Sequence, residues 1–342
     1  MSLVAGLFVI LLVASNAPGA HAESAMERAR YLMGTLCTAQ VHAPNDTVAS
    51  RALRAGFDEI ARIEQVMSSW REDSDVTMLN ATAGKQPFPC PAELYAALVS
   101  ARTLAEHTDG AYDPTIGPLI EAWDLRGKGR VPNKRQLEKA MAPVGWQSLV
   151  LDSDTQTASF ERDGMAVDLG GIGKGFALDH AVVAMELRGA TRGLLNFGGE
   201  ICAWSDGTPW DVSIADPADR LRPVLTFTIT DAAVSTSAQS ERGFERKGVR
   251  YGHVLDPKTG RPVDSTGSVT VIAGSATQAD ALSTALFVMG RDDAGMFARN
   301  NPDVGVVWLD HTGEGLLAWV WNAPELKPEH GVTVHFMDQP AE

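Results

Sequence analysis

The amino-acid sequence predicts a single mixed α+β domain, and three observations lead to this prediction. Some segments carry apolar residues at helical spacing, and others are short β-type runs separated by turns. No internal repeat and no low-complexity linker divides the chain. Its 342 residues, of which 44% are hydrophobic and 21% charged, suffice for one large globular core. The class that fits is α+β.

Helices are expected where apolar residues recur every three or four positions, as Leu53, Phe57, Ile60, Ile63 and Met67 do. The expected helices cover residues from about 53 to 67, 94 to 105, 174 to 188, 278 to 289 and 292 to 299. Gly189 and Gly290 follow the third and fourth of these helices, which is typical of a helix C-terminus.

Strands are expected where β-forming residues make short runs between turn residues. One group, with short connections, lies between about 149 and 169. The other expected strands cover residues 210–214, 224–229, 251–255, 269–273 and 305–309.

The first 22 residues are predicted to be a signal peptide. They carry no Lys, Arg, Asp or Glu, and the apolar run at 3–14 is shorter than the about 20 residues that a membrane span needs. Ala20-His21-Ala22 fits a cleavage site, after which Glu23 would begin a mature domain of residues 23–342. An uncleaved anchor or a buried helix is the alternative. We expect an exported protein whose mature chain has no stable membrane span.

The charge argues against nucleic acid as a partner, and the spacing of the cysteines argues against a metal cluster. The 43 acidic residues outweigh 29 basic ones, for a net charge of -14, and no basic run is present, so nucleic acid is not an expected partner. Cys37, Cys90 and Cys202 are widely spaced, which allows at most one disulfide and indicates no metal cluster.

A glycine-rich segment from Asp168 to Gly175, DLGGIGKG, is expected to join a strand to a helix and to bring backbone close to a ligand. It is not a P-loop, because Asp168 and Gly175 stand where that motif needs Gly and Ser or Thr. It is not a dinucleotide fingerprint either, because Phe176 stands where the last Gly belongs. A tight turn without a ligand explains the segment equally well.

Asp280 and Thr284 are four residues apart at the start of an expected helix, so their oxygens project from one face. Two hard oxygen ligands suit Mg²⁺, which completes its shell with phosphate and water. In isolation the simpler explanation is better: Asp280 favours the helix N-terminus and Thr284 bonds back to a carbonyl.

Two further segments place polar groups in turns. His253 at a strand end is a candidate general base, although a lone His is more often structural, and Asp256 nearby is equally a turn initiator. The stretch 107–115 follows a helix and contains Tyr112 and Asp113, which could clasp a planar ring; a helix C-cap at Gly110 explains the same residues.

Together these segments resemble the FAD:protein FMN transferase family, also called ApbE-like. The ordered set is MGT at 33–35, DGAYD at 109–113, DLGGIGKG at 168–175, NFGG at 196–199, STS at 235–237, HVLDP at 253–257 and the stretch 279–284. The resemblance covers nearly the whole mature chain, from about 33 to 290 and beyond.

The resemblance implies one domain with a T-fold-like core, exported or membrane-anchored. It implies that the protein binds FAD and Mg²⁺ and joins FMN through a phosphoester to a Thr or Ser hydroxyl of a target flavoprotein, releasing AMP. The metal would be held by the Gly171 carbonyl with Asp280 and Thr284. FAD contacts would fall on Met33, Ala111, Tyr112, Asp113, Asp168, Lys174, Leu255 and Ser283.

For the chemistry we expect His253 to take the proton of the incoming hydroxyl and Asp256 to orient it. Two departures from the family pattern matter. Lys174 stands where some members carry Glu, so its contact would be to phosphate or a ring carbonyl. No lipidation Cys follows the leader, so the mature enzyme would be free in the periplasm if the source is Gram-negative.

Three rival functions remain open at the level of the sequence. The nearest is an FAD pyrophosphatase that uses the same metal site but lets water attack, giving FMN and AMP. Another is a flavin-binding or storage protein without turnover, against which Asp280, Thr284 and His253 argue together. The third is an anchored interaction module, which leaves those residues unexplained.

Overall fold

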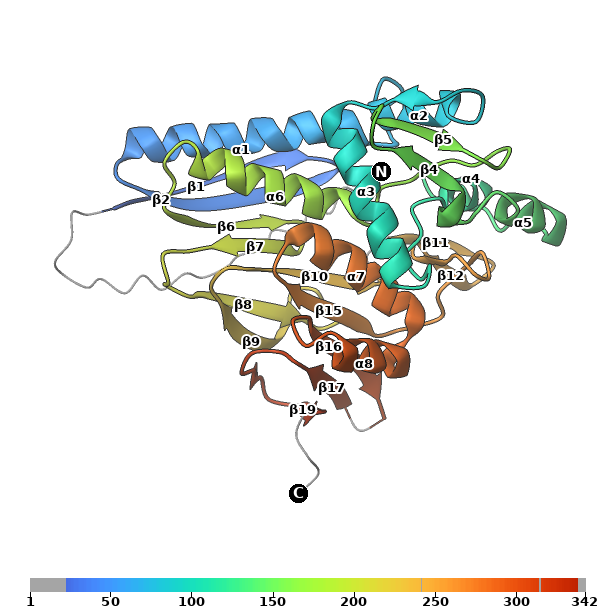
Figure 1. The fold of residues 1–342 in the computed structure, drawn as a ribbon. Coiled ribbons are helices and arrows are strands. Elements are labelled where there is room, and N and C mark those ends of the chain that lie inside the picture. The colour runs from blue at the N-terminus through green and yellow to red at the C-terminus, as the bar shows by residue number, and fades with distance from the viewer. Residues whose placement is uncertain (1–22, 241, 314, 338–342) are drawn as a thin grey trace.

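The computed structural model describes residues 23–240, 242–313 and 315–337, and the predicted signal peptide at 1–22 lies outside them. A nine-stranded sheet forms the centre of the fold (Figure 1). In spatial order its strands are β1 (Ser24–Leu32), β2 (Thr35–Ala43), β6 (Arg192–Phe197), β7 (Glu200–Trp204), β10 (Ala232–Ala238), β15 (Ser268–Ala273), β16 (Gly305–Thr312), β17 (Gly315–Trp321) and β19 (Val332–Phe336). Neighbouring strands are antiparallel except β17 and β19.

Helices cover one face of this sheet (Figure 1). They are α1 (Asp46–Met67), α3 (Ala92–His107), α6 (Gly173–Glu186), α7 (Ala276–Met289) and α8 (Arg291–Asn300). Strand β2 shows how the sequence selects this face, because its buried residues Cys37, Ala39 and Val41 alternate with the part-exposed Thr38 and Gln40. The alternate apolar residues join the main hydrophobic core under the helices.

A small three-stranded sheet packs on the opposite face of the central sheet. Its order is β18 (Lys327–Pro328), β9 (Pro223–Ile229) and β8 (Trp210–Ala215), so β8 lies at an edge. Val212, Ile214 and Phe227 of this sheet form a second apolar core with Leu194 and Ile201 of the central sheet. The central sheet is therefore buried on both faces over much of its width.

The remaining elements lie beside the central sheet, on the right of Figure 1. They are α2 (Asp75–Thr82), β3 (Phe88–Pro89), α4 (Gly117–Trp123), α5 (Lys134–Met141), η1 (Trp146–Ser148), β4 (Leu149–Asp152), β5 (Thr157–Phe160), β11 (Gly243–Arg246), β12 (Val249–Gly252), β13 (Leu255–Asp256) and β14 (Arg261–Pro262). A third apolar cluster of Leu119, Trp123, Leu137 and Leu255 holds α4 and α5 against β13.

The structure confirms the α+β class and all five expected helices. The group of strands expected between about 149 and 169 is confirmed as far as residue 160, where β4 and β5 form, and the strand predictions are wrong in two places. Residues 161–168 are irregular apart from a single bridge between Ala166 and Ile116, and the run at 251–255 is interrupted after Gly252. All three cysteines are buried and free. Within the described ranges, no helix is both long and apolar enough to cross a bilayer.

Candidate active site

Helices α6 and α7 cap each other, and this fixes the centre of the candidate site. Asp280 of α7 accepts a hydrogen bond through Oδ2 from the backbone N–H of Gly175, in the first turn of α6, at 3.0 Å. In return, Asp179 of α6 accepts hydrogen bonds from the backbone N–H groups of Ala276 and Thr277, at 2.8 and 2.9 Å. Because these N–H groups have no partner within their own helices, each carboxylate stabilises the start of the other helix.

Gly175 is required for this arrangement because the two helices approach closely there. A Cβ atom at position 175 would lie 2.1 Å from the backbone oxygen of Ala276. Glycine alone avoids that clash. The turn that precedes α6 is therefore held at a fixed distance from Asp280.

A cavity of about 510 Å³ lies at this junction. Its wall includes the predicted site residues Asp168, Gly171, Lys174, His253, Leu255, Asp280 and Thr284. Six other predicted residues are not part of the wall, namely Met33, Ala111, Tyr112, Asp113, Asp256 and Ser283. Three separate segments of the chain, at 168–174, 253–255 and 280–284, are thus brought together.

Lys174 joins two buried carboxylates in this wall. Its Nζ forms an ion pair with Glu200 and lies 4.0 Å from Oδ1 of Asp280. The side chains of Glu200 and Asp280 are only 6% and 5% exposed. Burial raises the pKa of Asp280, and the charge of Lys174 opposes that rise. Lys174 is the cation that keeps this pair of acids compatible with burial.

The predicted metal ligands all line the cavity. A Cβ atom at Gly171 would lie 3.2 Å from Oγ1 of Thr284, so the Gly171 backbone is next to that hydroxyl. Asp280 uses Oδ2 for Gly175, which leaves Oδ1 on the side of Lys174. No cluster of three His, Cys, Asp or Glu side chains is present in the described parts of the chain. The oxygen donors here fit Mg²⁺, which needs few protein ligands.

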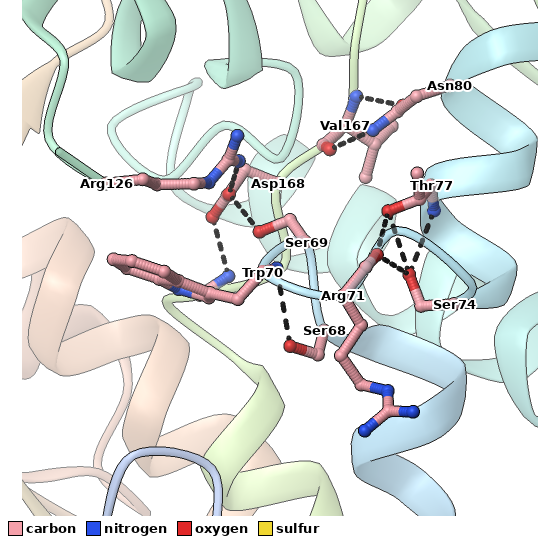
Figure 2. A network of polar contacts seen from close by, with 11 residues as sticks. Ser68, Ser69, Trp70, Arg71, Ser74, Thr77, Asn80, Arg126, Val167 and Asp168 are labelled. Carbon is pink, nitrogen blue, oxygen red and sulfur yellow. Dashed lines mark hydrogen bonds and ion pairs between the residues drawn. The ribbon is translucent and has the colours of Figure 1, made fainter.

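Asp168 organises another part of the cavity wall through a network of polar contacts (Figure 2). Its Oδ2 accepts hydrogen bonds from Ser69 Oγ at 2.7 Å and from the guanidinium of Arg126, and its Oδ1 accepts one from the Gly170 N–H at 2.9 Å. Asp168 therefore ties the end of α1 and the loop after α4 to the glycine-rich turn. Trp70, next to Ser69, is 62% exposed and lines the cavity.

The irregular backbone before Asp168 is held by a side chain instead of a strand partner. Asn80 of α2 donates to the carbonyl of Val167 at 2.8 Å and accepts from its N–H at 2.7 Å (Figure 2). The N–H of Asp168 itself bonds to the Pro114 carbonyl at 2.8 Å. These bonds satisfy the backbone groups that a neighbouring strand would otherwise satisfy.

His253 is a neutral imidazole in the cavity wall. Burial, together with the positive charge of Arg242, lowers its pKa to about 4. Its Nδ1 is buried and has no hydrogen-bond partner among the described residues. The predicted helper Asp256 is engaged elsewhere: it accepts from the Lys258 N–H and the Thr259 hydroxyl, both at 2.8 Å. This is the turn-initiating role considered above.

Several predicted flavin contacts are bonded within the protein. Asp113 accepts from the Thr115 hydroxyl at 2.6 Å and from the Trp146 N–H at 3.1 Å. Ser283 is buried against Ser235 and Ser237, at 3.1 and 2.9 Å.

Two more of the predicted contacts, Tyr112 and Met33, pack against the glycine-rich turn and are not part of the cavity wall. Tyr112 is packed beside Gly171, where its Cε2 would be 3.3 Å from an added Cβ. Met33 lies beside Gly173, with Cε 3.7 Å from the corresponding position.

Charge and unsatisfied polar atoms indicate an anionic ligand. The cations in the wall are Arg126, Lys128, Lys174, Arg220 and Arg242, and the acids are Asp124, Asp168, Glu200 and Asp280. Cations therefore outnumber acids in the wall by five to four, whereas acids outnumber cations in the whole chain, which has a net charge of -14. In the described residues, Arg126 Nε, Glu200 Oε2 and His253 Nδ1 are buried in this wall without a partner. Unpaired buried polar atoms are costly, and a polar ligand would satisfy them.

The residues that sequence reasoning missed include Trp70, Arg126, Lys128, Glu200, Arg220 and Arg242. A signal existed for two of them, because residues 124–129 read DLRGKG, a short loop with two glycines and two cations. Trp70, Arg220 and Arg242 are single residues in turns, and only the tertiary structure brings them to the site.

The model of the ApbE family matches residues 33–308 of this chain. An FAD:protein FMN transferase of Treponema pallidum is 32% identical over 325 residues, which is 89% of this chain and 90% of that protein. The FAD:protein FMN transferase of Escherichia coli K12 is 31% identical over 274 residues, 77% of each chain.

Solved structures agree with these sequence matches. The ApbE protein of Thermotoga maritima has a TM-score of 0.77 and 29% identity, covering 90% of this chain and 97% of its own. The apo form of the Pseudomonas stutzeri flavinyl transferase ApbE also has a TM-score of 0.77, with 27% identity over 89% of this chain and 98% of its own.

Proposed function

Because this chain belongs to the ApbE family and is a transferase of FMN from FAD, we propose that it acts with Mg²⁺ on a Thr or Ser hydroxyl of a target flavoprotein. The product is a phosphoester between FMN and that hydroxyl, and AMP is released. The observation that carries the proposal is the buried Asp280 carboxylate, oriented by Gly175, in a cavity where cations outnumber acids. Such a site suits a pyrophosphate.

Substrate binding would depend on the cations of the wall. Lys128 and Arg242 line the cavity from loops, and Lys174 lies beside Asp280. Their charges would hold the pyrophosphate of FAD, and the exposed ring of Trp70 would offer a flat apolar surface to one of its ring systems. Magnesium bound to the oxygens of Gly171, Asp280 and Thr284 would neutralise charge on the phosphate oxygens.

His253 would serve as the base for the incoming hydroxyl. Its low pKa, about 4, keeps it neutral at pH 7, so a ring nitrogen is able to accept a proton. The hydroxyl oxygen attacks the FMN phosphorus and loses its proton to His253. The bond between that phosphorus and the bridging oxygen of the pyrophosphate breaks, and AMP leaves with that oxygen.

The location of the protein is part of the proposal. An export signal at 1–22 and a catalytic domain at 23–342 would place the enzyme in the periplasm of a Gram-negative cell. The apolar run and the cleavage-type sequence at 20–22 support this assignment.

The test is to incubate the purified protein with FAD, Mg²⁺ and a candidate Thr-containing flavoprotein subunit and to measure the mass of that subunit. An FMN-sized gain that disappears without metal and in Asp280→Ala supports the transferase. The matched control is Asp303→Ala, an exposed loop acid that is not part of the cavity wall, which should leave the gain intact. FMN and AMP without a gain in acceptor mass would indicate a pyrophosphatase, and bound FAD without products a flavin-binding protein.

A further inference from the structure

A second cavity, of about 620 Å³, borders the free edge of strand β8. All six residues of β8, from Trp210 to Ala215, line it. Side chains of a strand alternate between two faces, so a cavity on one face would be lined by every second residue. A lining of consecutive residues means that the cavity reaches both faces of β8 around its free edge, where N–H and C=O groups point away from β9. Thr226 of β9 and Lys327 of β18, in one row with Ser213, extend the cavity over the outer face of the small sheet.

The other walls of this cavity suit a polypeptide backbone. They include the polar side chains of Thr38, Gln40, Asn196 and Ser268 on the second face of the central sheet. Ser268 Oγ is buried and has no partner among the described residues. These hydroxyl and amide groups are neutral donors and acceptors, which match peptide groups.

The charges of the second cavity differ from those of the active site. Its acids are Glu27, Asp211 and Asp216, and its cations are Arg220 and Lys327. Three acids against two cations do not favour a phosphate-bearing ligand. The flavin nucleotide therefore fits the active-site cavity, and a different ligand fits this one.

Arg220 connects the two cavities. Arg220 and Thr236 line both of them. Arg220 lies in the turn that follows β8, and its guanidinium donates to the Gly198 carbonyl at 3.3 Å. Gly198 lines the active-site cavity, and Gly199 lines the second one. The chain after the C-terminal end of β8 thus reaches the residues that separate the two cavities, Arg220 and Thr236, which we call the partition.

We propose that the acceptor polypeptide binds as an extended strand along the free edge of β8, which brings its hydroxyl past Arg220 into the active site. This inference rests on the proposed transfer to a protein. Six residues of strand span about 20 Å, so a short segment of the acceptor suffices. Backbone hydrogen bonds would provide the affinity, as in other cases of strand addition, and the partition at Arg220 would set the register.

The first test uses synthetic peptides of about ten residues centred on the residue that carries FMN in the modified acceptor, with one backbone N-methyl group moved along the peptide. Alternate N–H groups of an added strand face β8, so KM should rise about tenfold at every second position and stay unchanged at the positions between. A KM that shows no such alternation overturns the inference.

The second test fills the cavity from the central sheet. Gln40→Trp should raise the KM of the acceptor at least tenfold and leave the KM of FAD unchanged, because Gln40 lines only the second cavity. Thr38→Trp provides a second variant if Gln40→Trp does not fold. Thr333→Trp is the matched control, since Thr333 is exposed on β19, at the edge of the central sheet, and lines neither cavity.

The outcomes separate this inference from the proposed function. Transfer to the acceptor with an unchanged KM in both Trp variants overturns strand binding while the transferase stands. A raised KM for FAD in Gln40→Trp also overturns it, because the cavity would then hold part of the nucleotide. A complete lack of transfer by the unmodified enzyme rejects the proposed function itself.

Discussion

Asp280 of α7 accepts a hydrogen bond from the backbone N–H of Gly175 in α6 at 3.0 Å, with its other carboxylate oxygen toward Lys174 in the cavity. Oδ2 therefore stabilises the contact between the two helices, and Oδ1 faces the cavity. This division allows the two roles to be separated by mutation, because an amide oxygen is still able to accept the bond from Gly175 while the negative charge is lost.

Asp280→Asn should retain the fold and lose catalysis. We expect the melting temperature to fall by only a few degrees, as for a change of about 1 kcal/mol in a domain of this size. The rate of transfer should fall by about a hundredfold or more, since altering even an outer partner of a metal site costs roughly 10–100-fold. Thermal unfolding and acceptor mass measured at increasing Mg²⁺ check both parts. If the variant depends on Mg²⁺ as the wild type does, Asp280 is not a ligand of the metal.

Lys174→Met should destabilise the protein and strengthen Mg²⁺ binding. Removing the cation leaves Glu200 and Asp280 buried without compensation, which should cost about 2 kcal/mol, less than for a fully buried pair because Lys174 is 29% exposed. The same loss of positive charge favours a divalent cation beside Asp280. Chemical denaturation and calorimetric titration with Mg²⁺ measure the two effects.

The double variant Lys174→Met with Glu200→Gln is the control for this change. It removes the second buried charge and should restore most of the lost stability. If the double variant is as unstable as Lys174→Met alone, the loss comes from packing of the Lys174 stem and not from the unpaired carboxylates.

The sequence predicted those parts of the fold that local patterns specify. Helix α1 shows an apolar residue every three or four positions, and the structure forms it from Asp46 to Met67. The strand expected before Asp168 is wrong because a distant side chain, Asn80, satisfies the backbone there. Mutual capping by Asp179 and Asp280 was also beyond reach, since each acid caps a helix about 100 residues away.

The candidate site was predictable to a similar extent. Asp280 and Thr284 share a helix face, so their spacing alone places them together. Arg220 and Arg242 come from isolated positions in turns, and no local pattern distinguishes them from other surface cations. Tertiary packing decides which of these cations reach the cavity.

His253 should remain a working base down to acidic pH. Its pKa is about 4, below the ordinary 6.5, so the imidazole is neutral at any pH above about 5. The acceptor kcat/KM should therefore show no loss with a midpoint near 6.5 as the pH falls from 8 to 5. His253→Gln, measured over the same range, separates this base from other titrating groups. A midpoint near 6.5 that disappears in His253→Gln would show that the imidazole has an ordinary pKa in the working enzyme.

The same shift affects stability, with a definite sign. The unfolded chain binds a proton at His253 below about 6.5, and the folded protein does so only below about 4, so the unfolded state holds more protons between these values. The contribution of His253 to stability is fully present above 6.5 and is lost as the pH falls toward 4. It amounts to at most about 3 kcal/mol. Denaturation of His253→Gln should accordingly depend less on pH in this window than that of the wild type.

Gly175→Ala should disrupt the junction of α6 and α7. The new Cβ would lie 2.1 Å from the Ala276 oxygen, which is backbone and cannot turn away. Overpacking of this kind costs about 1–3 kcal/mol, and separating the helices also weakens the caps made by Asp179 and Asp280. The expected fall in melting temperature is on the order of 5–10 °C.

The matched control for that change is Gly274→Ala, in the turn before α7. Position 274 is exposed and has no atom within 4 Å of an added Cβ, so the melting temperature should stay within about 1–2 °C of the wild type. Because the Gly175 clash acts on Asp280 through its hydrogen bond, Gly175→Ala should also need more Mg²⁺ for half-maximal transfer, whereas Gly274→Ala should not. Equal melting temperatures and equal magnesium requirements in the two variants would mean that α6 and α7 do not pack this closely in solution.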